Sequence, residues 1–209
     1  MTKEEGLYIL NKLKEMHPNA KCELDFSSPF ELLVAVMLSA QCTDERVNKV
    51  TRKLFADYQT PEEFAEMSLD LLKKYIYSCG FFNNKGNNII EASRMICRDF
   101  GGEVPKNMDD LVSLPGVGRK TASVVLSVAY GIPAMPVDTH VFRVSRRLGL
   151  SAGDTVDKVE KDLESMFSVE DWYDVHHALI FHGRYICKSR NPMCENCLLR
   201  DKCKSKDKR

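Results

Sequence analysis

The stretch LPGVGRKTA, residues 114–122, decides the expected fold because it joins two helical patterns by a short turn. The acidic pattern NMDDLVSL leads into it, and the apolar pattern of RKTASVVLSVAY follows it. Gly116 and Gly118 have no side chains, so the turn can expose backbone N–H groups where the second helix begins. The sequence therefore predicts a helical hairpin over about residues 107–130.

Two cations, Arg119 and Lys120, stand where this second helix begins, although the positive end of a helix dipole favours acids. A phosphate group could lie against the amides of Gly116 and Gly118, with a charge-assisted contact from Arg119. The helix start and the neighbouring arginine both disfavour the charged form of Lys120, and a free amine is a nucleophile. Lys120 is therefore either a phosphate-binding lysine or a nucleophile that attacks a carbonyl or sugar C1′ carbon and forms a Schiff base.

Asp138 is a possible partner for this lysine. It is the single acid in residues 113–150, which also contain five bases. A carboxylate there could take the proton from Lys120, or stabilise positive charge on a sugar as its bond to a base breaks. Alternatively, Asp138 caps the next helix, with Thr139 in the first turn. Both interpretations stay open at this point.

Four cysteines lie close together in CKSRNPMCENCLLRDKC with the spacing Cys-x6-Cys-x2-Cys-x5-Cys: Cys187, Cys194, Cys197 and Cys203. Thiolates are preferred ligands of zinc and of iron–sulfur clusters. The spacing matches neither the usual zinc knuckles nor the repeated run of bacterial ferredoxins, so the ligand set alone leaves the metal open. A metal would fix the ends of this basic loop and so shape a phosphate-binding surface.

The other four cysteines are scattered along the chain at Cys22, Cys42, Cys79 and Cys97. The N-terminus MTKEEGLYIL lacks the apolar core of a signal peptide, and no apolar run reaches about 18 residues. We therefore expect a cytoplasmic protein with no membrane association, where thiols stay reduced. The scattered cysteines are expected to be small buried hydrophobic residues.

The charge of the chain is segregated, although the net charge is zero. Residues 113–150 hold five bases and one acid, residues 151–175 two bases and eight acids, and residues 187–209 eight bases and three acids. Local basic surfaces can bind a polyanion even on a neutral protein, because phosphates respond to the nearby field. Two stretches are therefore candidates for contact with nucleic acid.

Hydrophobic periodicity predicts an all-α protein, since almost no stretch alternates as a strand would. Helix starts are indicated by Ser28 before Pro29, by a capping box from Thr60 to Glu63, and by Ser68, whose helix is expected to stop at Gly80.

Breaks near residues 18–28 and 131–136 predict one lobe over residues 22–132. A second lobe would form from residues 1–21 together with 133–209.

The motifs LPGVGRKTA, VDTHVFRV, HGRYICKSRNPMCENC and SSPFELLVAVMLSAQCTDERVN closely resemble the endonuclease III family of DNA repair glycosylases, in the helix-hairpin-helix superfamily. The likeness runs from about residue 25 to 203. It implies two helical lobes with DNA held in the cleft between them, and a helix-hairpin-helix over about residues 107–130.

The resemblance also implies the chemistry. Lys120 would be the nucleophile and Asp138 its acidic partner, and a [4Fe-4S] cluster would bind the four cysteines of the loop at residues 187–203. The protein would act as a monomer on double-stranded DNA that contains a damaged base or an abasic site. It would remove oxidised pyrimidines and then cleave the strand by β-elimination through a lysine Schiff base.

The family fills the space left by a flipped base with a glutamine of the SAQ-x-TD loop and an apolar residue of a second loop. These positions match Gln41 and Phe81. Family members commonly have leucine at the second position, so a phenylalanine there leaves the wedge role and the opposite-base preference open. Without the resemblance, a loop phenylalanine is equally consistent with packed core.

Two alternatives remain. The adenine mismatch glycosylases share the hairpin and the cluster, but they usually lack the catalytic lysine and carry a further C-terminal domain; Lys120 and the end of the sequence at Arg209 argue against them. A non-enzymatic DNA-binding module with a zinc-stabilised knuckle would also use the hairpin and the cysteines. That module leaves the isolated acid Asp138 unexplained.

Overall fold

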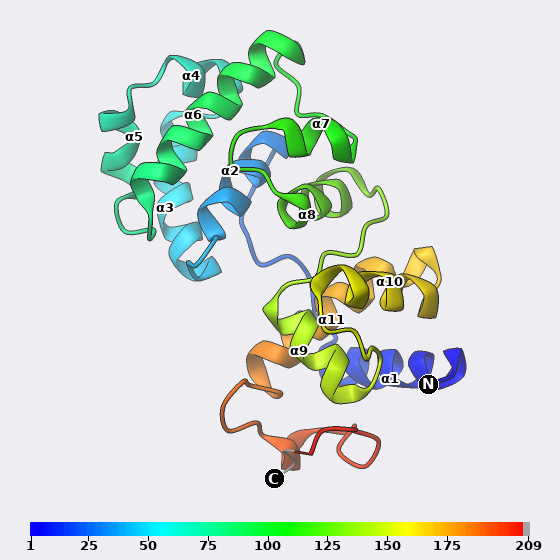
Figure 1. Cartoon of the computed structure of the whole chain (residues 1–209). Helices are drawn as coiled ribbons and strands as arrows, with labels where there is room; N and C mark the ends of the chain where they lie inside the picture. Colours follow the sequence, from blue (N-terminus) through cyan, green and yellow to red (C-terminus); the bar gives the residue numbers. More distant parts are fainter. Residues whose placement is uncertain (207–209) are drawn as a thin grey trace. The chain divides into compact units, whose positions relative to one another are not determined.

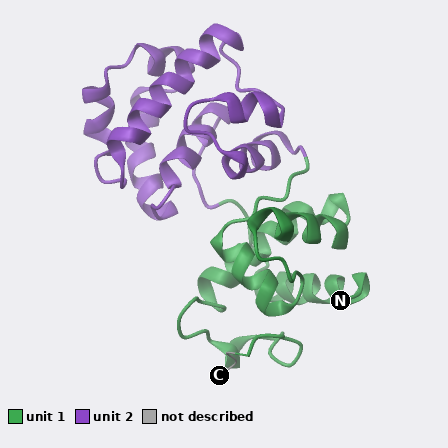
Figure 2. Ribbon diagram, in the orientation of Figure 1, with its two compact units in different colours: residues 1–22, 133–209 green, residues 23–132 purple. Residues whose placement is uncertain are grey.

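The computed structural model describes residues 1–206, whose regular structure is entirely helical (Figure 1). The predicted all-α class is confirmed. The chain divides into two compact units, Met1–Cys22 with Pro133–Arg209, and Glu23–Ile132 (Figure 2). We call them the terminal unit and the central unit. Within residues 1–206, no helix is both long enough and apolar enough to cross a membrane.

The central unit is built around one buried helix. Its helices are α2 (Pro29–Ser39), α3 (Asp44–Asp57), α4 (Pro61–Glu66), α5 (Leu69–Ile76), α6 (Phe82–Asp99), α7 (Met108–Ser113) and α8 (Arg119–Tyr130). Every α2 residue from Phe30 to Leu38 is at most 6% exposed, and α2 contacts α3, α6 and α8. A helix that is buried on all sides needs apolar residues on all sides, which FELLVAVML supplies with the one exception of Glu31.

Helix starts in the central unit follow the expected capping residues. Ser28 Oγ accepts from the Glu31 amide, and Thr60 and Glu63 form the predicted capping box. The end of α5 differs from the expectation, because the helix stops at Ile76 rather than continuing to Gly80. The Cys79 amide donates to the Ile76 carbonyl at 2.8 Å, which turns the chain away from the helix axis.

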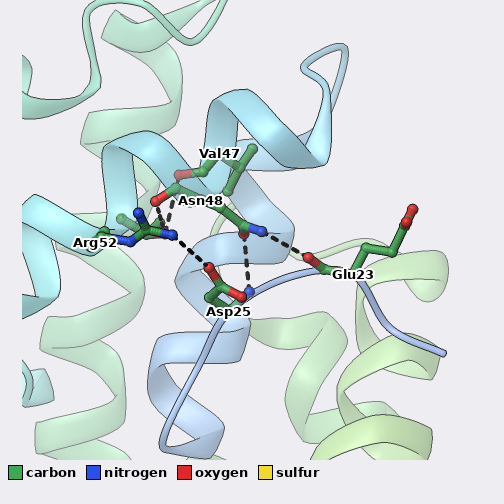
Figure 3. Close-up of polar contacts among 6 residues, drawn as sticks. Glu23, Asp25, Val47, Asn48 and Arg52 are labelled. Atoms are coloured by element: carbon green, nitrogen blue, oxygen red, sulfur yellow. Dashed lines mark hydrogen bonds and ion pairs between the residues drawn. The ribbon is translucent and has the colours of Figure 1, made fainter.

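The chain enters the central unit along α3, where one side chain fixes it (Figure 3). The side-chain Nδ2 of Asn48 donates to the Glu23 carbonyl at 2.8 Å, and its Oδ1 accepts from the Asp25 backbone N–H at 3.0 Å. An exposed ion pair joins Arg52 to Asp25 at 3.5 Å. Asn48 thus satisfies a backbone donor and a backbone acceptor of a segment that has no helix of its own.

The terminal unit joins both ends of the described chain around α11. Its elements are α1 (Lys3–Met16), α9 (Thr139–Leu148), α10 (Val156–Met166), η1 (Val169–Asp171), α11 (Trp172–Tyr185) and η2 (Cys194–Asn196). Helix α11 packs on α1 and on α9, and its core includes Leu13, Val141 and Leu179. Cys22 belongs to this unit, one residue beyond the expected boundary.

Candidate active site and metal centre

The predicted hairpin consists of α7, the turn at residues 114–118 and α8. Gly116 has a φ of +77°, and a Cβ at this position would lie 2.7 Å from the Asn88 side chain, so this residue must be glycine. Gly118 is the N-cap of α8, and a Cβ there would meet nothing within 4 Å. The side of Gly118 on which a Cβ would stand is therefore open.

Two helix starts in the central unit differ from the other five. Within residues 23–132, α2, α3, α4, α5 and α7 each have a side-chain cap and an acid in the first turn, whereas α6 and α8 have neither. Their N-cap residues are Phe81 and Gly118. The positive ends of these two helices are therefore not neutralised by the helix itself, and such ends favour an anion such as a phosphate group.

Arg119 and Lys120 are the first two residues of α8, and both are exposed. Their neighbours Val117 and Ala122 are buried, with exposures of 5% and 0%, so the backbone that carries the two cations is firmly anchored. The geometry presents the Lys120 amine to solvent at an uncapped helix start. An amine in this position can meet an electrophile that is held by the same amides.

Asp138 is the N-cap of α9, where its Oδ1 accepts from the Val141 amide at 2.7 Å. Asp138 therefore does cap the next helix, as one of its two interpretations expected. A carboxylate has a second oxygen, and a half-buried cap can still receive a proton or face a positive charge. Lys120 belongs to the central unit and Asp138 to the terminal unit, and each begins a helix of its own unit.

Gln41 and Phe81 share an unusual backbone conformation. In residues 1–206 the non-glycine residues with positive φ are Gln41, Phe81 and Asn191, at 57°, 57° and 51°. Such strained residues gather at functional sites. A Cβ on Gly80 would lie 3.9 Å from the Gln41 carbonyl oxygen, so the two turns are neighbours. The Phe81 side chain is 65% exposed, which rules out the packed-core alternative.

The four clustered cysteines line a single pocket of about 30 Å³ after α11. All four are half-buried, and Leu148, Ile186 and Met193 complete an apolar lining. Within residues 1–206, no three His, Cys, Asp or Glu side chains converge tightly enough to hold one metal ion. A single zinc ion needs its sulfurs at about 2.3 Å from one point. Four thiols around one pocket are a soft ligand set of the kind that zinc and iron–sulfur clusters take.

Two arginines of α9 hold the backbone of this loop. Arg143 donates to the carbonyls of Gly183 and Cys187, at 2.9 and 3.2 Å, and Arg147 donates to the carbonyl of Lys188 at 2.7 Å. The sequence suggested that these arginines belong to a basic run near nucleic acid. Their spacing of four residues places them on one face of α9, and this spacing was the available signal for a shared role.

His182 packs inside the terminal unit against a cluster cysteine. It is 1% exposed, its Nε2 lies 3.5 Å from Cys197 Sγ, and its Nδ1 lies 3.2 Å from Nε2 of His17. Burial lowers the pKa of His182 to about 4, so its ring is neutral at neutral pH. A neutral ring has one donor and one acceptor nitrogen, which suits a contact to each neighbour.

Comparison with known proteins agrees with this arrangement. Residues 34–168 match the HhH-GPD superfamily of base excision DNA repair proteins. Endonuclease III from Bacillus subtilis strain 168 is 53% identical over 203 residues, which are 97% of this chain and 93% of that protein. The chain belongs to the endonuclease III family. Endonuclease III from Escherichia coli K12 is 47% identical over 208 residues, 100% of this chain and 99% of its own.

Solved structures of endonuclease III have the same fold. A trapped endonuclease III–DNA covalent intermediate superposes with a TM-score of 0.94 at 49% identity, covering 98% of this chain and 96% of that one. A non-covalent endonuclease III–DNA complex gives a TM-score of 0.94 at 48% identity, with the same coverage. The endonuclease III fold thus extends over nearly the whole chain, including the cysteine loop that lies beyond residues 34–168.

Proposed function

We propose that this protein is a base excision DNA repair enzyme, a bifunctional DNA N-glycosylase that also cleaves abasic sites. The observation that carries the proposal is the exposed Lys120 amine at the uncapped start of α8. An endonuclease III with 49% identity has been trapped as a covalent intermediate with DNA. A covalent bond to DNA requires a nucleophile, and Lys120 has the chemistry and the accessibility for that role.

The substrate that we propose is duplex DNA with an oxidised pyrimidine or an abasic site. Damage weakens stacking and pairing, so a damaged base leaves the duplex at lower cost than an intact one. Gln41 and Phe81 lie in neighbouring turns, and Phe81 is exposed. Their side chains are suited to fill the space that the flipped base leaves. The helix starts of α6 and α8 would hold the flanking phosphates.

The reaction that we propose has two stages. The Lys120 amine attacks C1′ of the deoxyribose, a C–N bond forms, and the bond between C1′ and the base breaks as the base leaves with a proton. Opening of the sugar ring gives a Schiff base, which acidifies the C2′ proton. Loss of that proton expels the 3′ phosphate by β-elimination and breaks the strand on the 3′ side of the lesion.

Asp138 would assist this reaction with its carboxylate. It is suited to take the proton that Lys120 loses, or to stabilise the positive charge that grows on the sugar as the base departs. Its cap bond to Val141 fixes one oxygen, which orients the second oxygen. Asp138 therefore serves the fold and the chemistry with the same side chain.

The cofactor that we propose is a [4Fe-4S] cluster on Cys187, Cys194, Cys197 and Cys203. Four thiols around an apolar cavity match the ligand set of such a cluster. When bound, it would close the loop between Cys187 and Cys203. Arg143 and Arg147 hold the same loop from α9, so the exposed bases Lys188 and Arg190 are presented on a fixed backbone.

The proposal is tested by incubating the purified protein with duplexes that differ in one nucleotide. We expect base release and strand cleavage on a duplex with an oxidised pyrimidine, cleavage alone on one with an abasic site, and neither on the undamaged duplex. On a fourth duplex, with adenine opposite a damaged guanine, an adenine mismatch glycosylase would release the adenine, and a DNA-binding module would leave all strands intact. Either outcome would overturn the proposed activity.

A sedimentation measurement on the same preparation tests the expected monomer.

A further inference from the structure

The turns that carry Gln41 and Phe81 also carry two cysteines that the proposed reaction does not use. Cys42 follows Gln41 directly, and Cys79 precedes Phe81 by two residues. Cys79 is completely buried and Cys42 is half-buried. The turns that carry them are neighbours, since a Cβ on Gly80 would lie 3.9 Å from the Gln41 carbonyl oxygen. Two cysteines that lie 37 residues apart in the sequence thus belong to neighbouring turns, the proposed DNA-contacting turns.

Backbone hydrogen bonds fix the two turns that carry Cys42 and Cys79. Lys85, in the first turn of α6, is 8% exposed and donates from Nζ to the Leu38 carbonyl at 2.8 Å. Leu38 lies in the last turn of α2, where a cation is favoured by the helix dipole. The Cys42 amide donates to the Ser39 carbonyl at 3.0 Å, and the Cys79 amide to Ile76. Each cysteine therefore sits in a hydrogen-bonded turn, and Lys85 ties the start of α6, which follows the Cys79 turn, to the end of α2, which precedes the Cys42 turn.

The two thiols differ in how readily they react. Burial and the neighbouring Cys42 thiol raise the pKa of Cys79 to about 11. Burial also lowers the pKa of Lys85, which lies close to both thiols. Cys42 is the thiol that solvent and small molecules can reach. Because Cys79 is completely buried, its expected reaction partner is Cys42 Sγ once that sulfur is part of a mixed disulfide.

We propose that Cys42 and Cys79 are a redox modification site that forms a reversible disulfide between the two proposed DNA-contacting turns. The oxidant is a low-molecular-weight disulfide. The Cys42 thiolate attacks one of its sulfurs, which forms a mixed disulfide and releases one thiolate. The Cys79 thiol then attacks Cys42 Sγ and passes its proton to the departing thiolate, which forms the protein disulfide and releases the second thiol.

The bond would change what the two turns can do. A disulfide between Cys42 and Cys79, close to Gln41 and Phe81 in the sequence, would fix the separation of their turns and so restrict how the two side chains reach a duplex. The consequence for DNA rests on the proposed function, whereas formation of the bond does not. Oxidation should weaken binding to a lesion duplex by about tenfold or more, since loss of one stacked aromatic side chain has an effect of this size.

The crosslink is tested on the holoprotein with oxidised glutathione as the probe. Free thiols are then alkylated, and the digested protein is mapped by mass spectrometry. We expect a peptide pair joined through Cys42 and Cys79, two hydrogens lighter than the separate peptides and cleaved by dithiothreitol. Cys42→Ser and Cys79→Ser should each abolish the pair, and Cys97→Ser, at a half-buried cysteine elsewhere in the unit, should leave it unchanged.

Recovery of both cysteines in alkylated form, or glutathione retained on Cys42 with no crosslink, would overturn the inference. A Cys79→Ala variant, which keeps the pocket apolar, guards against misfolding of the serine variant. Binding to a lesion duplex is then compared for oxidised and reduced wild type. Equal affinity of the two forms would refute the effect on DNA. Because the mapping needs no enzyme activity, absence of glycosylase activity would leave its result intact.

Discussion

The Lys120→Ala variant should bind a duplex with an oxidised pyrimidine normally but lose base release and strand cleavage, by a factor on the order of 10⁴. Without the amine no bond to C1′ can form, so neither the base departure nor the β-elimination has a route. Lys120 is exposed and lies on a helix, where alanine is well tolerated. Single-turnover kinetics and a binding titration on the same duplex separate chemistry from affinity.

Arg119 provides the matched control because it is the neighbouring exposed cation on the same helix turn. Arg119→Ala should weaken binding to all duplexes alike and reduce the salt dependence by about one phosphate contact. Its single-turnover rate at saturation should stay close to that of the wild type. If Arg119→Ala and Lys120→Ala lost cleavage equally, the two residues would both be phosphate ligands, and the nucleophile would have to be sought elsewhere.

Asp138→Asn should fold normally and lose base release by a factor of roughly 10² to 10⁴. Asparagine is as good an N-cap as aspartate, so the bond to the Val141 amide is retained. The variant removes the negative charge and the ability to accept a proton, and nothing else. Single-turnover base release measures the chemistry, and thermal unfolding measures the cap.

Asp138→Ala completes this comparison, since it removes both the charge and the cap. It should lose activity like Asp138→Asn and should also be less stable by about 1 kcal/mol. Full activity in the asparagine variant, combined with reduced stability in the alanine variant, would show that Asp138 is a capping residue alone. The cap that the structure shows would then be its complete role.

Local sequence signals predicted the hairpin and most helix starts, because the interactions that determine them span only a few residues. Gly116 needs positive φ, Ser28 and Thr60 are caps, and the acids of α7 lie in its first turn. The end of α5 was not predictable in this way. A glycine at position 80 suggested a stop there, but a hydrogen bond from Cys79 ends the helix four residues earlier.

Features that depend on contacts distant in sequence were not predictable from the chain alone. The exposure of Phe81 and the left-handed backbone at Gln41 have no signal in the local sequence. Arg143 and Arg147 bond the carbonyl groups of Gly183 and Lys188, which lie 40 and 41 residues later in the sequence. Hydrophobic spacing cannot report such partners, because it shows which face is buried and not what covers it.

The most direct test of the central claim is to reduce the reaction mixture with borohydride while the enzyme turns over a duplex with an oxidised pyrimidine. Reduction converts the Schiff base into a stable amine, so protein and DNA become linked. We predict that digestion and mass spectrometry will place the DNA remnant on Lys120, with no linkage in Lys120→Ala. Linkage at another residue, or unchanged trapping in that variant, would contradict the account.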